Sequence, residues 1–264
     1  MFLKPKKVKF GKINIKHLNT MSEFNEFDEQ GSAPEKSTGA IISHAFEMYK
    51  GVFLYAVVAM IIYSILGGII QAITGMNSSA MLEEMRDSGN YSRFSVFNAP
   101  GFPLYLTLSG ILGLLLSPLY VGLIYMINKY NTKNPIDFSD LFIGYRQNFV
   151  NILIYALLSG IISSIALSLC ILPIIFVYPL LMLGYPILLF ENASATEALG
   201  KSFNIAKENY GVFLGATFVG FLLSMAGIVL CFIGIIVTAP FIFAVMYSLY
   251  CAHLGKPRQI ILNK

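Results

Sequence analysis

Several serines crowd two apolar stretches of the chain: Ser159, Ser163, Ser164, Ser168 and Ser224. A serine becomes a nucleophile only when a neighbouring base can take its proton. The sequence has three histidines, at His17, His44 and His253, and neither a histidine nor a lysine shares the depth of these serines. We therefore interpret the serines as small residues at helix contacts and predict no catalytic residues and no enzyme activity.

Metal and redox chemistry lack a recognisable ligand pattern. The three cysteines are Cys170, Cys231 and Cys251, and they form no Cys-x-x-Cys pair. The three histidines are also far apart, unlike the ligands of a zinc site. Proton-coupled or ion-coupled transport normally uses buried Asp, Glu or His side chains, and the apolar stretches contain none of these apart from His253 at the end of the last one. We predict no bound metal and no cofactor.

Three prolines recur at one interval inside apolar stretches. Pro118, Pro179 and Pro240 are separated by 61 residues each. A proline inside a helix frees a backbone carbonyl and kinks the helix. Three kinks at equivalent depth could open a shared central cavity, or they could serve tight packing. We favour packing, because neighbouring helices are enough to satisfy such kinks.

The composition indicates a membrane protein. Charged residues make up 12% of the 264 residues and hydrophobic residues 56%, whereas a soluble domain has about 25% charged residues. A soluble protein of this size could not cover so much apolar surface, so lipid is the expected solvent. The net charge is +4, but no basic patch is interleaved with base-stacking aromatics, so we predict no nucleic-acid partner.

Six apolar stretches are long enough to cross a bilayer, which needs about 20 residues per helix. The uncharged run 149–190 is too long for one crossing and is divided at Pro173, and the run 211–254 is divided at Gly234. The predicted spans are 52–74, 102–127, 149–171, 174–190, 211–232 and 235–253. The expected fold is therefore an all-α membrane bundle of six transmembrane helices.

The distribution of basic residues predicts the orientation. With the N-terminus in the cytoplasm, only Arg86 and Arg93 of the 18 lysines and arginines fall in outer segments. Basic residues favour the cytoplasmic side, so both termini are predicted to be cytoplasmic.

Residues 1–38 are expected to form a disordered tail and 256–264 a second, short tail. Met21 is an alternative translation start.

A threefold repeat is predicted within residues 39–255. Each copy contains an apolar residue followed after four, four and three residues by an aromatic, a basic and an aromatic residue, a spacing that keeps them near one helix face. The three sets are Ile42, Phe46, Lys50 and Phe53; Phe138, Phe142, Arg146 and Phe149; and Leu199, Phe203, Lys207 and Tyr210. The copies, about 39–128, 135–190 and 194–254, each comprise an amphipathic helix and a transmembrane hairpin. We predict a pseudo-threefold bundle, with a divergent first copy because its outer loop, 75–101, is long.

Each amphipathic helix has a local start signal. Ser194 and Glu197 have the spacing of a capping box, Asn134 and Pro135 suit an N-cap and first helical position, and Thr38 offers a weaker start. Basic and aromatic residues on such helices suit the membrane interface. The alternative is that each helix is a cytoplasmic extension of the span that follows it.

The last third of the chain resembles a group of uncharacterised bacterial polytopic membrane proteins. The residues that carry the resemblance are Glu197, Ala198, Leu199, Ser202, Lys207 and Asn209, followed by a glycine-rich apolar hairpin and a proline-containing span. This group includes the membrane domain attached to some glycerophosphodiester phosphodiesterases. The resemblance covers roughly residues 40–255 and implies a membrane module without the hydrolase activity, since the attached soluble phosphodiesterase is absent.

The expected function is that of a non-enzymatic scaffold or accessory module of the bacterial plasma membrane. Aromatic residues would anchor the amphipathic helices, and basic residues would bind the phosphates of anionic lipids or acidic groups of a protein partner or a second copy. The predicted contact residues are Phe46, Lys50, Phe142, Arg146, Phe203 and Lys207. The alternative is a carrier or flippase-like transporter of a lipid or hydrophobic solute, which would use a cavity at the three prolines.

Overall fold

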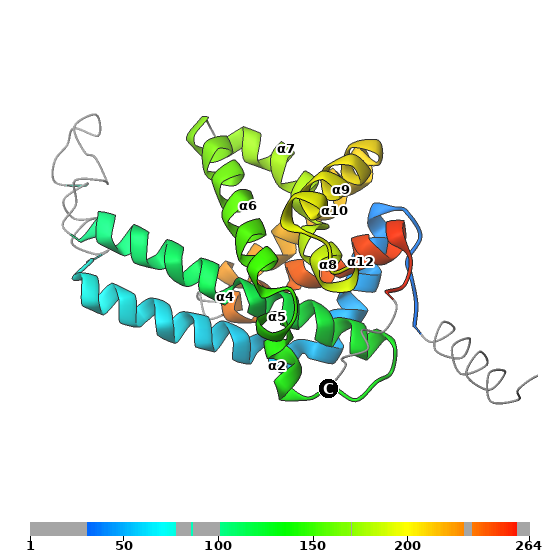
Figure 1. The fold of residues 1–264 in the computed structure, drawn as a ribbon, viewed down its shortest axis with the longest axis horizontal. Helices are drawn as coiled ribbons and strands as arrows, with labels where there is room; N and C mark the ends of the chain where they lie inside the picture. Colours follow the sequence, from blue (N-terminus) through cyan, green and yellow to red (C-terminus); the bar gives the residue numbers. More distant parts are fainter. Residues whose placement is uncertain (1–30, 78–85, 87–100, 170, 230–233, 258–264) are drawn as a thin grey trace, which may run out of the picture.

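The computed structural model describes residues 31–77, 86, 101–169, 171–229 and 234–257, and this part of the chain contains helices and no β-strand (Figure 1). The outer loop of the first copy lies almost entirely outside the described residues, as do Cys170, Cys231 and residues 1–30. The helices are α2 (Thr38–Thr74), α4 (Phe102–Asn131), η2 (Phe138–Phe142), α5 (Ile143–Arg146), α6 (Phe149–Leu169), α7 (Ile171–Leu181), α8 (Gly184–Phe190), α9 (Ala195–Glu208), α10 (Tyr210–Met225), η3 (Ala226–Val229), α11 (Gly234–Thr238) and α12 (Phe241–Leu254).

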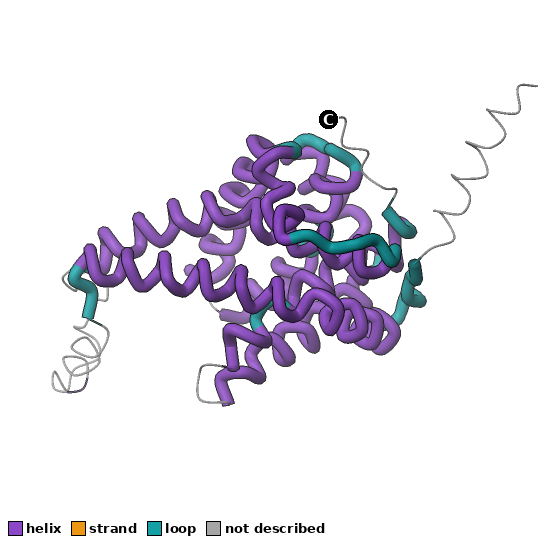
Figure 2. Tube along the Cα trace, turned by 90° about the horizontal axis from the view of Figure 1, so that it is seen from below, coloured by secondary structure: helices purple, strands orange, loops and turns teal. Residues whose placement is uncertain are grey.

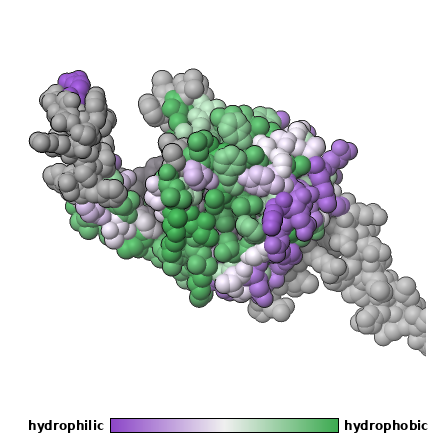
Figure 3. Space-filling model, turned by 90° about the horizontal axis from the view of Figure 1, so that it is seen from above, coloured by the Kyte–Doolittle hydropathy of each residue, from purple (hydrophilic) through white to green (hydrophobic). Residues whose placement is uncertain are grey.

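Six helices in the described residues are long and apolar enough to cross a membrane, which confirms the predicted fold class. They are Thr38–Thr74, Phe102–Asn131, Phe149–Leu169, Leu172–Phe190, Tyr210–Ile228 and Gly234–Leu254. Hydrophobic residues cover a broad face of the molecule in Figure 3, and hydrophilic residues gather at one end of it. The chain is therefore a multi-pass membrane protein, since lipid is the solvent that matches such a surface.

Two of the predicted start signals agree with the structure and one does not. Ser37 caps α2, and Ser194 forms a capping box with Glu197 at the start of α9. The start predicted at Asn134 and Pro135 is wrong, because η2 begins only at Phe138. There the carboxylate of Asp140 accepts a hydrogen bond from the backbone N–H of Asp137 at 2.8 Å, so an acidic residue fixes the start of the helix.

The three surface segments join their spans differently. In the first copy there is no junction: α2 is one helix of 37 residues, so this amphipathic segment is an extension of its span, as the alternative interpretation proposed. In the other copies an asparagine separates the two helices. Asn148 adopts a left-handed φ of 54° between α5 and α6, a conformation that asparagine tolerates better than most residues. Asn209 ends α9 and precedes α10.

The even-numbered spans form the inside of the bundle and the odd-numbered spans the outside. Within the most apolar stretch of each span, 56%, 50% and 56% of the residues are buried in spans two, four and six. The corresponding shares in spans one, three and five are 11%, 22% and 33%. The inner helices α4, α8 and α12 contact one another, so the centre of the bundle is filled by packed helices.

The outer helices contact the inner ones in a cyclic order. Each outer helix packs on the inner helix of its own hairpin and on that of the preceding copy: α6 contacts α7 and α4, α10 contacts α12 and α7, and α2 contacts α4 and α12. Figures 1 and 2 show the α2–α4 hairpin extending away from the rest of the bundle. This order of contacts is the one that the predicted repeat would produce.

Glycines allow the short segment after α4 to lie against that helix. A Cβ added to Gly122 would lie 1.9 Å from the carbonyl oxygen of Leu141, and one added to Gly144 would lie 2.5 Å from that of Pro118. No side chain fits in either place, so the backbones of α4, η2 and α5 are in direct contact. Such close contact is a principal source of stability between helices in lipid, where apolar burial alone contributes little.

Candidate functional site

The three predicted basic residues lie at the surface of the protein. Lys50 on α2, Arg146 at the end of α5 and Lys207 near the end of α9 are all exposed. Of their aromatic neighbours, Phe46 is 52% exposed and Phe203 44% exposed. The ammonium group of Lys50 lies 4.8 Å from the centre of the Phe46 ring, a cation–π contact that leaves the charge at the surface.

Phe142 is the predicted contact residue that is not well exposed. Its ring is half-buried and packs against Phe138 and Tyr145, with ring centres 5.7 and 6.2 Å away. Phe138 is 48% exposed. In the second copy, the exposed aromatic residues are therefore Phe138 and Tyr145, and the ring of Phe142 packs against both.

Two other lysines, on α4 and α9, are engaged in ion pairs. The Nζ atom of Lys129 lies 2.7 Å from a carboxylate oxygen of Asp140, and that of Lys201 lies 2.5 Å from one of Glu191. Within the described ranges, Lys50, Arg146 and Lys207 form no ion pair. The charges of the predicted residues are therefore available to a ligand, as are those of Lys36 and Lys133 outside the predicted pattern.

The three prolines affect their helices to different extents. Pro118 lies inside α4, which continues for a further 13 residues to Asn131. Pro179 lies near the end of α7, and the fourth span is interrupted before α8 begins at Gly184. Pro240 separates α11 from α12. The inner helices α4, α8 and α12 contact one another, which favours the packing interpretation, although residues beside all three prolines, including Tyr120, Tyr178 and Phe243, line one cavity next to this centre.

A tyrosine hydroxyl contacts the helix turn that precedes each of these prolines. Tyr145 donates a hydrogen bond to the carbonyl of Leu115, Tyr210 to that of Phe176, and Tyr49 to that of Val237. Each acceptor lies three residues before its proline, and the acceptors are again 61 residues apart. A proline disturbs the hydrogen bonds of the preceding turn, so a side-chain donor is favourable there.

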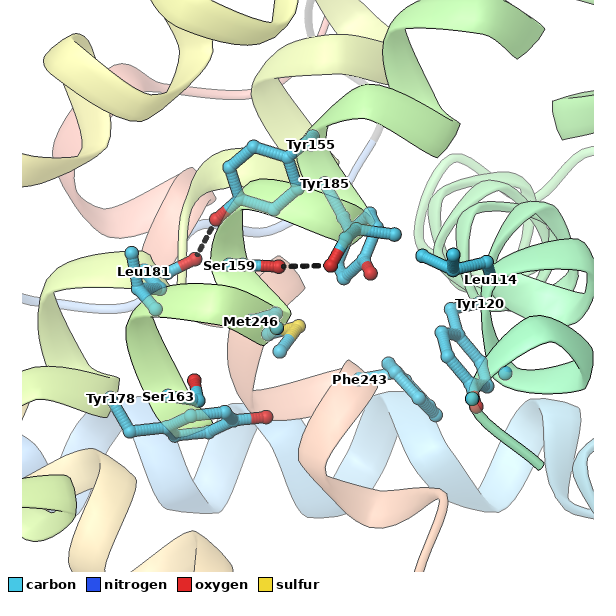
Figure 4. A pocket seen from close by; sticks show the side chains of 14 residues that line it. Leu114, Tyr120, Tyr155, Ser159, Ser163, Tyr178, Leu181, Tyr185, Phe243 and Met246 are labelled. Carbon is cyan, nitrogen blue, oxygen red and sulfur yellow. Dashed lines mark hydrogen bonds between the residues drawn. The ribbon is translucent and has the colours of Figure 1, made fainter. Parts of the chain in front are cut away.

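A cavity of about 420 Å³ lies beside the packed centre, between α4, α6, α7, α8 and α12 (Figure 4). We call it the first cavity. Tyr155 donates a hydrogen bond to the carbonyl of Leu181 at 2.6 Å, and the hydroxyl of Tyr185 lies next to that of Ser159. A Cβ at Gly184 would lie 1.9 Å from the Tyr155 ring, so this glycine makes room for the tyrosine.

A second cavity of about 450 Å³ lies between α7, α10, α11 and α12, and we call it the second cavity. Its walls are apolar apart from a few hydroxyl groups. The lining residues are Ser163, Ile174, Ile175, Tyr178, Thr217, Phe218, Phe221, Ser224, Met225, Ile235, Ala239 and Ile242. Ser163 and Tyr178 line both cavities, and Figure 4 shows these two side chains next to each other.

The two cavities occupy corresponding positions in the second and third copies. Residues that line the first are matched, 61 positions later, by residues that line the second: Leu114 by Ile175, Ala156 by Thr217, Ser163 by Ser224, Tyr178 by Ala239, and Leu181 by Ile242. The serines at 163 and 224 were interpreted from sequence as helix contacts. They line cavities instead, while Gly220 and Gly227 do approach neighbouring helices closely.

A buried polar network at the N-terminal end of α2 was not predicted from sequence. The side chain of Asn131 accepts hydrogen bonds from the backbone N–H and hydroxyl of Ser32, and it donates to the Ser32 carbonyl and the Tyr247 hydroxyl. His44 contacts the hydroxyl of Ser248 at 2.8 Å and that of Ser32 at 3.1 Å. Ser32, within the predicted tail, is therefore attached to the bundle.

The sequence contains a pattern from which part of this network could have been predicted. Asn128 and Asn131 follow the second apolar stretch and lie one turn apart on one helix face, a spacing suited to a shared partner. In the structure both are buried, and both interact with Tyr247. The partner itself lies more than a hundred residues away, so only the fold identifies it.

Comparisons with known proteins identify no relative: no family model, no curated protein and no solved structure matches the chain. Within the described parts of the chain, no group of three or more His, Cys, Asp or Glu side chains is placed to hold a metal ion. Function must therefore be inferred from the surface and the cavities themselves.

Proposed function

We propose that this multi-pass protein is a non-enzymatic accessory or scaffold module of the bacterial plasma membrane, with cytoplasmic termini, that binds anionic lipid headgroups. The observation that carries the proposal is the difference between two groups of basic residues. Lys129 and Lys201 are neutralised by carboxylates, whereas Lys50, Arg146 and Lys207, at matching positions of the predicted repeat, are exposed and unpaired in the described structure. We call these three residues the basic surface.

The physical chemistry of a membrane surface supports this role. Each lysine or arginine close to an anionic leaflet contributes about 1 kcal/mol of attraction. Exposed aromatic residues such as Phe46 and Phe203 favour the boundary between headgroups and hydrocarbon. A basic residue beside an exposed aromatic ring therefore suits this boundary. Its charge binds an anionic headgroup, and the ring contacts the acyl chains.

The proposal is tested by the lipids that copurify with the protein. The variant Arg146→Glu/Lys207→Glu is expected to retain several-fold less anionic lipid than the unmodified protein in native mass spectrometry, with unchanged retention of zwitterionic lipid. Adding Lys50→Glu should lower it further. The matched control is Lys36→Glu/Lys133→Glu, which changes the charge equally at exposed residues outside the predicted pattern. Equal losses in the two double variants would refute a specific basic surface.

A carrier is the second candidate, and the two lateral cavities favour it. They lie between helices, and the exposed rings of Phe218 and Phe221 stand at the second cavity. Movement of a fluorescent lipid between leaflets of proteoliposomes distinguishes the candidates. A scaffold leaves the rate of the empty vesicles unchanged, whereas a carrier accelerates it. We favour the scaffold because α4, α8 and α12 contact one another at the centre of the described structure.

A further inference from the structure

The second cavity contains two buried hydroxyl groups without a hydrogen-bond partner. Thr217 is 5% exposed and Ser224 is 7% exposed, and neither Oγ1 of Thr217 nor Oγ of Ser224 has a partner in the described structure. Both residues line the cavity from α10. A buried hydroxyl loses its hydrogen bonds to water and is costly unless another group replaces them.

Several other hydroxyl groups in the spans donate a hydrogen bond to a carbonyl of their own helix. Ser117 donates to the carbonyl of Leu114 at 2.8 Å, Ser168 to that of Ile165 at 2.8 Å, and Thr107 to that of Pro103 at 2.8 Å. This backward bond is the usual arrangement for serine and threonine inside a helix. Thr217 and Ser224 depart from it, and both do so in the same cavity.

The spacing of the two hydroxyls restricts the ligand. Residues seven apart lie on one helix face, separated by about 10 Å along the axis. A ligand that lies between the two hydroxyls, along the helix axis, accepts one hydrogen bond of about 2.8 Å from each. Its two acceptor oxygens are then about 5 Å apart. This is the separation of the carbonyl oxygens on opposite sides of a six-membered quinone ring.

The cavity walls fit such a ring. Tyr178, Phe218 and Phe221 supply aromatic surface, and the remaining lining residues are aliphatic side chains, small residues and hydroxyl groups without any charge. Aromatic rings pack favourably against a flat conjugated ring. A phosphate-bearing headgroup is disfavoured, because burial of an unpaired charge among these residues would be very costly.

The position of the cavity allows entry from lipid. Thr217 and Ser224 lie about 10 and 21 Å along the helix from Tyr210, which places both within the hydrocarbon. Phe218 is 48% exposed and Phe221 is 53% exposed on the outer surface of α10, so the cavity adjoins the lipid-facing side of the protein. The ligand would therefore be a neutral molecule that is dissolved in the membrane.

We propose that the second cavity binds the ring of a membrane quinone, with Thr217 and Ser224 each donating a hydrogen bond to one of its two carbonyl oxygens. The apolar tail of the quinone would leave the cavity between the rings of Phe218 and Phe221. This binding site is independent of the basic surface, so either proposal can fail without the other.

The test uses the full-length protein in lipid nanodiscs with a benzoquinone that carries a decyl tail. One ring carbonyl is isotope-labelled, so that the two carbonyl stretching bands separate in the infrared spectrum. Both bands are expected to shift to lower wavenumber in the protein relative to empty nanodiscs. Thr217→Val should abolish one shift and Ser224→Ala the other, and each variant should weaken binding about 3- to 10-fold. These substitutions remove a hydroxyl with little change of volume.

The control is Ser168→Ala, whose hydroxyl is bonded within α6 and does not line the cavity. It should leave both bands and the affinity unchanged. Unshifted bands in the unmodified protein, or the same shifts in the Thr217→Val/Ser224→Ala double variant, would overturn the proposal. A third result would also overturn it: dioctanoylglycerol binds more tightly than the quinone, and its binding depends on Thr217 and Ser224 in the same way. The site would then be one for ester carbonyls.

Discussion

The hydroxyl of Tyr210 donates a hydrogen bond of 3.0 Å to the backbone carbonyl of Phe176, three residues before Pro179. It connects the start of the third copy to the inner helix of the second. Tyr145 makes the corresponding contact from the second copy to the first, and Tyr49 from the first to the third. The three bonds therefore join the hairpins in a closed cycle, and the threefold repeat stays a prediction.

The first prediction concerns these tyrosines. Tyr49→Phe, Tyr145→Phe and Tyr210→Phe should each lower the free energy of unfolding by about 1 kcal/mol, because a carbonyl beside a proline loses its donor in lipid. Unfolding in mixed micelles of mild detergent and dodecyl sulfate measures the change. Tyr105→Phe is the control, since the Tyr105 hydroxyl has no hydrogen bond in the described structure. An equal loss of unfolding free energy in Tyr105→Phe would mean that the hydrogen bonds do not cause the destabilisation.

The second prediction concerns the contact between α4 and the segment after it. Gly122→Ala should destabilise the protein by about 3 kcal/mol or more, because the added methyl group overlaps the backbone of Leu141. Gly113→Ala in the same helix meets no atom within 4 Å and should be neutral or stabilising by up to about 1 kcal/mol. Thermal unfolding of the two purified variants in one detergent makes the comparison, and similar stabilities would contradict this packing.

The third prediction concerns Asn131. Asn131→Leu removes four hydrogen bonds to Ser32 and Tyr247 and should cost about 2–4 kcal/mol, since the buried Tyr247 hydroxyl and the polar groups of Ser32 lose this partner. Hydrogen exchange of residues 31–37 should accelerate in this variant. Asn204→Ala, at an exposed position of α9, should leave that exchange rate unchanged. Unaltered protection of 31–37 in Asn131→Leu would show that other contacts hold the segment.

The fourth prediction concerns pH and the start of α9. The backbone N–H of Ser194 and then its hydroxyl donate hydrogen bonds to the Glu197 carboxylate, at 2.9 and 2.7 Å, and lower the pKa of Glu197. This stabilisation is therefore present above the ordinary glutamate pKa of about 4.3 and is lost as the pH falls through the lowered value. Hydrogen exchange at residues 195–200, corrected for the intrinsic effect of pH, should reveal fraying in acid.

Glu197→Gln provides the comparison for that experiment. The neutral amide keeps an acceptor oxygen but cannot titrate, so protection of 195–200 should be lower than in the unmodified protein near neutral pH and should not fall further in acid. An identical pH dependence in the two proteins would exclude Glu197 as its cause.

Much of the fold was predictable because lipid imposes a simple rule on sequence. A span needs about 20 uncharged residues, and this places the ends of helices within a few positions. The first span was predicted to end at residue 74 and does so, and the third begins at 149 as predicted. The continuity of the first helix with its span was only the alternative prediction, because polar residues such as His44 and Lys50 precede the apolar stretch.

The candidate sites were only partly predictable. The spacing of Lys50, Arg146 and Lys207 follows from helical periodicity, so their exposure could be anticipated from sequence. The cavities depend on side chains from separate hairpins. Thr217 and Ser224 look like ordinary small residues of a span, and only the packing of α7 and α11 near α10 leaves their hydroxyls without a partner.

The unbroken course of α2 has a mechanical consequence. At 1.5 Å per residue its 37 residues form a rod of about 55 Å, almost twice the thickness of the hydrocarbon. The other two hairpins have asparagine joints, at which a tilt of the span can be absorbed. Helix α2 has no such joint. A change in bilayer thickness that tilts one end of α2 therefore also moves its other end, which includes the contact between His44 and Ser32. The first hairpin thus lacks the joint that would let its span tilt independently of the N-terminal segment.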